Sequence, residues 1–200
     1  LGPNGAGKTI LLKTILGLYP HSGKIILDKK LKIGYLPQKI NLNPYMRLTA
    51  SELFEMKRNM LKLPKSSVQE AIKLLKLKES ILPKQLVTLS GGDLQKVFLV
   101  FTLIGDPDII ILDEPTSHID LAGEKKIHDS LHHLMKLNKP AVIMASHDLH
   151  MVHEHADWVL GVNKEEIGFG KASKMLVHDV LTRIFGAHHK RHHLGHKEEV

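Results

Sequence analysis

The first fourteen residues of the chain, Leu1-Gly-Pro-Asn-Gly-Ala-Gly-Lys-Thr-Ile-Leu-Leu-Lys-Thr14, decide the fold. They contain the spacing Gly-x-x-x-x-Gly-Lys-Thr, which is typical of a loop that holds phosphate groups between a strand and a helix. Bare glycine backbone lets N–H groups approach an anion, and the start of the helix adds a favourable dipole. We therefore expect phosphate binding here, with a plain glycine-rich turn as the alternative. The candidate residues are Gly2, Pro3, Asn4, Gly5, Ala6, Gly7, Lys8 and Thr9.

The composition is that of one globular domain or a domain with an added lobe. The chain has 200 residues, is 42% apolar and contains no cysteine, so disulfides and thiolate metal sites are excluded. No apolar run approaches the ~20 residues of a membrane helix. The net charge is +7, but the lysines are dispersed and aromatic residues make up only 4%, so we expect no nucleic-acid partner. The absence of a recognisable signal peptide predicts a cytoplasmic location.

Apolar segments alternate with amphipathic ones, which indicates an α/β fold with a mostly parallel sheet flanked by helices. Residues 49–86 are helical in pattern and interrupt this alternation, so we expect an inserted helical lobe at about 48–104. The α/β domain with its lobe would span 1–186, and 187–200 would form a histidine-rich tail. Because the chain begins with Leu and lacks a strand before the phosphate loop, we expect the N-terminal strands of the fold to be missing. The strands are expected at 24–27, 32–36, 109–112, 141–145 and 158–162. The helices are expected at 8–18, 90–104, 123–136 and 149–155. A hairpin at 164–170 and a helical tail should end the fold.

Two acidic residues end the apolar stretch Ile109-Ile-Ile-Leu-Asp-Glu114. A strand that ends in this way places the carboxylates at the carboxyl edge of the sheet, where α/β proteins bind ligands. Asp113 could hold Mg²⁺ through water, and Glu114 could orient or deprotonate an attacking water. A solvated strand end is the alternative.

The stretch Leu89-Ser-Gly-Gly-Asp-Leu-Gln95 begins another helix. Ser90 can cap that helix and Asp93 stands at the partner position of a capping box. Capping does not account for Gly91 and Gly92, because glycine in a helix costs about 1 kcal/mol relative to alanine. Bare backbone at this helix start predicts a second anion site.

The same stretch resembles the signature loop of ABC-type ATPases, and further motifs follow in that family's order. Gln38 in Tyr-Leu-Pro-Gln is similar to the Q-loop glutamine, Asp120 in Ser-His-Ile-Asp to the D-loop, and His147 in Ala-Ser-His-Asp to the switch histidine. The chain departs from the family at Asp93, where Gln or Glu is usual, and its adenine-stacking aromatic would lie upstream. The resemblance implies a P-loop NTPase with ATP and Mg²⁺ as cofactors, and a head-to-tail homodimer in which each ATP lies between two subunits. It assigns catalysis to Glu114, His147 and Gln38, metal binding to Thr9, Gln38 and Asp113, and contacts with the partner's nucleotide to Ser90, Gly91, Gly92 and Asp120.

Two stretches, 32–43 and 146–152, resemble the zinc-uptake branch of the metal-type transporters within that family. This implies a subunit that energises zinc import, attached peripherally to the cytoplasmic face of the membrane through a polytopic permease and served indirectly by a metal-binding substrate protein. A manganese or iron importer, a non-transport ABC protein acting on ribosomes or DNA, and a P-loop kinase remain alternatives. Imidazoles suit zinc, so the tail could bind it or could be a solvated extension. The tail histidines are His188, His189, His192, His193 and His196, whereas His128, His132 and His133 are expected on an exposed helix face.

Overall fold

The computed structural model describes residues 1–117, 119–136 and 140–186. The chain divides into two compact units, which we describe separately: one comprises Leu1–His21 with Ala145–Val200, and the other Ser22–Met144. The histidine-rich tail lies outside the described residues, so zinc binding by it stays a prediction. Among the described residues, no helix combines the length and hydropathy needed to cross a bilayer.

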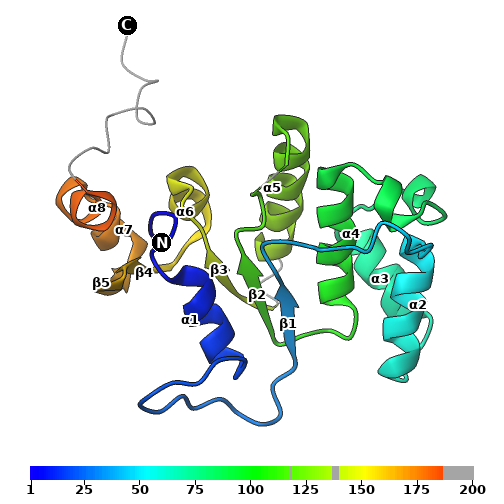
Figure 1. Cartoon of the computed structure of the whole chain (residues 1–200), viewed down its shortest axis with the longest axis horizontal. Helices are drawn as coiled ribbons and strands as arrows, with labels where there is room; N and C mark the ends of the chain where they lie inside the picture. The colour runs from blue at the N-terminus through cyan, green and yellow to red at the C-terminus, as the bar shows by residue number, and fades with distance from the viewer. Residues whose placement is uncertain (118, 137–139, 187–200) are drawn as a thin grey trace, which may run out of the picture. The chain divides into compact units, whose positions relative to one another are not determined.

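A three-stranded sheet forms the centre of the unit Ser22–Met144 (Figure 1). Its order is β1 (Ile33–Leu36), β2 (Ile109–Asp113), β3 (Ala141–Ala145), and β1 pairs parallel with β2, with Ile33 opposite Ile109. The side chains of Ile110, Ile111 and Leu112 are at most 1% exposed. This burial on both faces is what the continuous apolar run predicts, and it confirms the α/β class with a parallel sheet.

The strand expected at 24–27 is wrong, because no strand forms there. Ile26 is 78% exposed, and Ile25 and Leu27 are about 40% exposed. High β-propensity does not make a strand by itself, since the backbone N–H and C=O groups need a neighbouring strand as partner. Within the described residues this segment pairs with none.

Helices follow in the same unit: α2 (Ala50–Met60), α3 (Ser66–Leu74), two short 3₁₀ turns η1 (Glu79–Ile81) and η2 (Leu86–Thr88), and α4 (Gly91–Leu103). A capping box starts α2: Thr49 Oγ1 accepts from Glu52 N at 3.2 Å, and Thr49 N donates to Glu52 Oε2 at 2.8 Å. The sequence therefore predicts the helical character of this segment correctly.

Close packing of α4 on β1 depends on one glycine. A Cβ at Gly34 would lie 2.7 Å from Thr102 Cγ2 and 2.8 Å from Thr102 O, so only glycine fits. The next helix, α5 (Leu121–Lys136), starts two residues before the predicted Gly123. Asp120 is the reason, because its Oδ1 accepts from Gly123 N at 2.9 Å in the manner of an N-cap.

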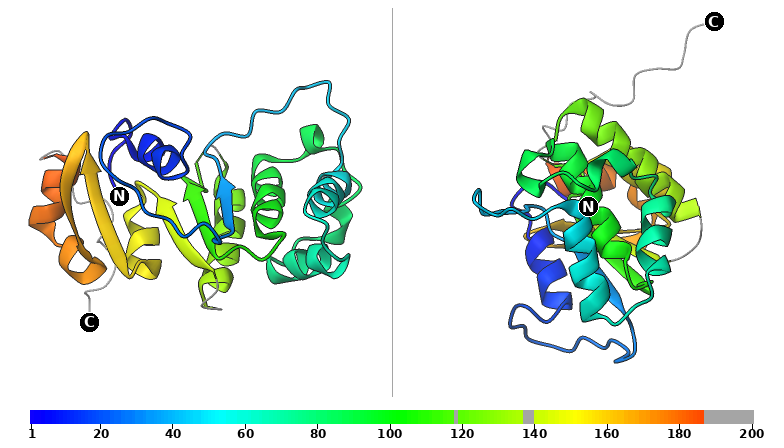
Figure 2. Two further views of the ribbon diagram at one scale, coloured as in Figure 1. Left: turned by 90° about the horizontal axis from the view of Figure 1, so that it is seen from below. Right: turned by 90° about the vertical axis from the view of Figure 1, so that its right-hand side faces the viewer.

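The other unit contains α1 (Lys8–Ile15), α6 (Leu149–His155), the strands β4 (Trp158–Asn163) and β5 (Glu165–Lys171), and the helices α7 (Ala172–Met175) and α8 (His178–Phe185). The strands β4 and β5 form an antiparallel hairpin of their own, which packs beside α7 and α8 (Figure 2). One hydrophobic core cluster of this unit consists of Val152, Val159, Met175 and Ile184.

The first helix, α1, ends three residues before the predicted Leu18. At its end, Gly17 adopts the left-handed region at φ 73°, and its N–H donates to Thr14 O at 2.9 Å. Glycine at this place is a common helix stop, because it takes a positive φ without steric cost.

Candidate functional site

The phosphate loop precedes α1 with two glycines in left-handed conformation. Gly5 has φ 78° and Gly7, the N-cap of α1, has φ 99°. Lys8 is only 7% exposed, and its Nζ donates to Gly2 O at 2.8 Å and to Pro3 O at 3.0 Å. The lysine that the motif assigns to phosphate binding therefore curls over its own loop.

The β4–β5 hairpin holds this loop through backbone hydrogen bonds. Val162 N donates to Leu1 O at 2.9 Å, and Lys164 N donates to Ala6 O at 3.1 Å. A Cβ placed on Gly2 would overlap the carbonyl oxygen of Val162. Gly2 is thus required by a close backbone approach. The sequence does not predict that the hairpin contacts this loop, because backbone contacts between distant segments leave no residue pattern.

The segment that carries His147 is attached to the same loop. Gly2 N donates to Ser146 O at 3.3 Å, while Ser146 Oγ accepts from Asp148 N at 2.9 Å. Asp148 caps α6 by accepting from His150 N at 2.8 Å. His147 lies between these fixed points with an exposed side chain, so the structure brings the phosphate loop and the predicted switch histidine together.

The two acidic residues lie at the end of β2, as predicted. Asp113 is fully buried and Glu114 is 7% exposed. Glu114 has φ 47°, a left-handed conformation that costs energy in a residue with a side chain and is concentrated at functional sites. Gln38 Nε2 donates to Glu114 Oε2 at 3.1 Å, so two of the three predicted catalytic residues are in direct contact although 76 positions separate them.

Ser90 is the N-cap of α4, as predicted, and its Oγ accepts from Asp93 N at 3.2 Å. Of the predicted capping box, the bond from Asp93 N to Ser90 Oγ is formed. The Asp93 carboxylate pairs with Lys126 Nζ of α5 at 3.0 Å, in addition to its hydrogen bond with Ser90. Partial burial alone would raise the pKa of Asp93. Hydrogen bonds from Lys126 and Ser90, with the charges of Lys126 and Lys84, outweigh burial and hold that pKa below its usual value.

One buried polar residue near this loop was not singled out from the sequence. Gln95 is 5% exposed, and its Nε2 has no hydrogen-bond partner within the part of the chain that the structure describes. A buried amide donor without a partner is costly, so this side chain invites a test by substitution.

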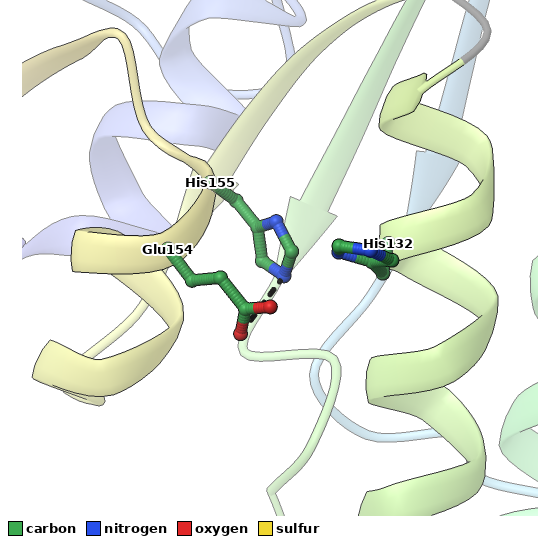
Figure 3. Close-up of side chains that lie close together, drawn as sticks. All are labelled: His132, Glu154 and His155. Atoms are coloured by element: carbon green, nitrogen blue, oxygen red, sulfur yellow. Dashed lines mark ion pairs between the residues drawn. The ribbon is translucent and has the colours of Figure 1, made fainter.

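Three histidines, His128, His150 and His155, lie close to carboxylates on their own helices. In α6, Glu154 Oε2 lies 3.6 Å from His155 Nε2 (Figure 3) and 3.8 Å from His150 Nδ1. In α5, His128 Nε2 lies 3.8 Å from Glu124 Oε1. His128, His132 and His133 are half-buried rather than exposed, which corrects the expectation for that helix face.

The structure therefore gathers the predicted site residues into local groups. Gly2 to Thr9 lie with the His147 segment, Gln38 lies with Glu114 at the end of β2, and the helix starts at Gly91 and Leu121 carry the remaining candidates. Hydroxyl, amide and carboxylate oxygens of this set are ligands that Mg²⁺ prefers. That all these residues serve one nucleotide stays a prediction.

Comparison with known proteins identifies the family of this chain. The family model described as "ABC transporter" matches residues 1–117. The "Zinc import ATP-binding protein ZnuC" of Mannheimia succiniciproducens is 34% identical over 187 residues, which cover 93% of this chain and 69% of the relative. The protein of the same name from Yersinia enterocolitica is 35% identical, with 100% of this chain and 81% of the relative covered.

Solved structures are similar over the same extent. An ABC transporter in an inward-facing conformation matches with a TM-score of 0.80 and 27% identity, over 92% of this chain and 76% of the other. The cbiO1 protein of Clostridium perfringens, part of the ABC transporter complex cbiONQ, matches with a TM-score of 0.73 and 27% identity, over 92% of this chain and 80% of the other.

Proposed function

Because the chain belongs to the ABC transporter family, we propose that it is the ATP-hydrolysing subunit of a transporter that imports zinc. The observation that carries the proposal is the phosphate loop, in which left-handed Gly5 and Gly7 leave the backbone bare and Lys8 lies over the loop. Relatives named as zinc import proteins at 34% and 35% identity support zinc over manganese or iron.

Lys8 and the loop N–H groups would bind the phosphates of ATP, since helix N-termini and glycine backbone favour anions. Thr9, Gln38 and Asp113 offer the hydroxyl, amide and carboxylate oxygens that would hold Mg²⁺, which supplies charge neutralisation when bound. Glu114 would orient or deprotonate the attacking water, and His147 would act on the outer phosphate from the segment beside the loop. These roles rest on the resemblance and on the local geometry of each group.

Ser90, Gly91, Gly92 and Asp120 would contact the ATP held by a second copy in a head-to-tail dimer. The start of α4 supports this, because its N-cap and two glycines leave N–H groups available to an anion. We further propose a polytopic permease as the membrane partner, a metal-binding substrate protein that acts indirectly, and a peripheral position on the cytoplasmic face.

The enzymatic part is tested by Glu114→Gln, with Glu79→Gln as control because Glu79 is exposed and lies outside the site. Loss of the base should lower turnover by about 10²- to 10⁴-fold, while ATP binding is retained. ATP binding is measured by titration with a fluorescent analogue. Turnover that stays near that of the Glu79 variant would contradict the role given to Glu114.

The transport part is tested with the assembled transporter in vesicles. ATP-dependent uptake should be fastest for Zn²⁺ when Zn²⁺, Mn²⁺ and Fe²⁺ are offered separately. Preference for Mn²⁺ or Fe²⁺ would favour the other metal importer, and copurification with ribosomes instead of a permease would favour the non-transport alternative.

A further inference from the structure

Helices α4 and α5 lie side by side (Figure 1), and their first turns touch through two glycines. A Cβ on Gly92 would lie 2.5 Å from Gly123 Cα, and a Cβ on Gly123 would lie 2.9 Å from Gly92 Cα. Backbone therefore rests on backbone, and no side chain fits between the two helix starts. This contact sets the distance between the two helices. Glycine has no side chain, so the two glycines add little attractive interaction between the helices.

An ion pair completes this contact. Lys126, one turn into α5, places Nζ 3.0 Å from Asp93 Oδ1 in the first turn of α4. The two side chains are 45% and 26% exposed, so the pair is partly screened by solvent. Asp93 is also joined to the N-cap, because its N–H donates to Ser90 Oγ. Lys126 is thus linked through Asp93 to Ser90.

The other side of the junction holds Asp120. Its Oδ1 accepts from Gly123 N at 2.9 Å, which fixes Asp120 to the glycine that touches Gly92. Both segments that the proposed function assigns to the partner's nucleotide are therefore attached to one small junction, made of Gly92, Gly123, Asp93 and Lys126.

We propose that Lys126 is a positioning residue for ATP hydrolysis: its ion pair with Asp93 holds Ser90 and Gly91 in register with Asp120. The proposal rests on the proposed function, since it assumes that these segments act on a nucleotide. Gly91 and Gly92 lower the intrinsic helix stability of the first turn of α4, so the ion pair between Lys126 and Asp93 can stabilise this turn. Lys126 itself is given no contact with the nucleotide.

The test compares Lys126→Met with Lys125→Met in the full 200-residue chain. Lys125 is the exposed neighbour on the same helix, so the control removes the same charge without breaking the pair. Hydrogen exchange of the amides at 91–95 should accelerate about two- to fivefold in the Lys126 variant, the scale expected for loss of a partly exposed ion pair. Lys126→Arg should restore slow exchange. The Asp93 carboxyl, followed by ¹³C NMR, should titrate at a higher pH in the Lys126→Met variant only.

Activity then separates a positioning role from a purely structural one. In Lys126→Met, kcat should fall about two- to fivefold with KM for ATP unchanged, because the phosphate loop of the same chain is untouched. Gly123→Ala, which wedges a methyl group against Gly92, should lower kcat in the same way while leaving Lys126 in place.

Three results would overturn the proposal in different ways. Equal exchange in the Lys126 and Lys125 variants would show that the pair does not hold the first turn of α4. Faster exchange with unchanged kcat would show that it holds the turn without positioning it for hydrolysis. An assembled transporter that contains the wild-type chain and shows no ATPase activity would refute the proposed function itself, and the exchange comparison would then decide only whether the ion pair holds the first turn of α4.

Discussion

Substitution of Gly2 by alanine should damage the phosphate loop more than the same substitution at Gly5. At Gly2 the new Cβ overlaps the carbonyl oxygen of Val162, which belongs to the hairpin backbone and cannot swing away as a side chain would. At Gly5 a Cβ meets nothing within 4 Å, and only the left-handed φ of 78° opposes it. The two glycines of one loop are therefore required for different physical reasons.

The expected costs follow from these differences. Forcing a methyl group into a packed site costs about 1–3 kcal/mol. If the shift also breaks the bond from Gly2 N to Ser146 O, a further ~0.5–1.5 kcal/mol is lost, which gives about 1.5–4.5 kcal/mol in total. A left-handed alanine at Gly5 costs about 1–2 kcal/mol. The lower entropy of its unfolded chain returns about 0.4–1 kcal/mol, so the net loss at Gly5 is about 1 kcal/mol.

Urea denaturation followed by Trp158 fluorescence measures these costs, because Trp158 is the only tryptophan and lies in the hairpin that supports the loop. With a slope of about 2 kcal/mol per M, Gly2→Ala should lower the midpoint by about 1–2 M, and Gly5→Ala by about half a molar. Gly5→Asn should lower it less still, since asparagine tolerates the left-handed region. A Gly2 variant at least as stable as the Gly5 variant would refute the steric argument.

Two further substitutions test buried polar groups in the other unit. Gln95→Met should raise the free energy of unfolding by about 1 kcal/mol, because it removes an amide donor that is buried without a partner in the described residues. Urea denaturation measures this change. A loss of stability would show that the Gln95 amide is hydrogen-bonded. Burial lowers the pKa of Lys57 to about 8 from its ordinary value near 10.5. Between pH 8 and 10.5 the folded chain therefore binds fewer protons than the unfolded chain. The free energy of unfolding should consequently rise with pH over this range. Lys57→Met should reduce this rise in thermal denaturation curves recorded from pH 8 to 10.5, whereas Lys73→Met, at an exposed position, should retain it in full.

The sequence predicts those parts of the fold whose causes are local. Ser90 caps α4 because a serine before a helix start can bond the N–H three residues on, and the buried strand β2 follows from its unbroken apolar run. The apolar run Ile25 to Leu27 has the same local appearance as a strand. It fails because pairing depends on a neighbour, which a single segment cannot specify.

The site shows the same division between local and distant causes. The glycines and Lys8 of the phosphate loop are recognisable from spacing alone, whereas the bond between Gln38 and Glu114 joins residues 76 positions apart. The sequence predicts Asp93 as part of a capping box within its own helix, and its carboxylate also meets Lys126, 33 positions away. Competition between a local and a distant partner is decided by tertiary packing, which leaves no signal in one sequence.

The hydrogen bonds from Lys8 Nζ to the carbonyl oxygens of Gly2 and Pro3 must be broken before the ammonium group can bind a ligand. An incoming molecule must draw the ammonium away from two carbonyl oxygens at 2.8 and 3.0 Å before it can use that charge. Charge-assisted hydrogen bonds to phosphate are strong enough to make the exchange favourable, while a neutral nucleoside has no anion to offer in return. Under the proposed function, Lys8 would leave these two carbonyl oxygens for an anion, so the loop would select ligands by charge before any other part of the site contacts the base.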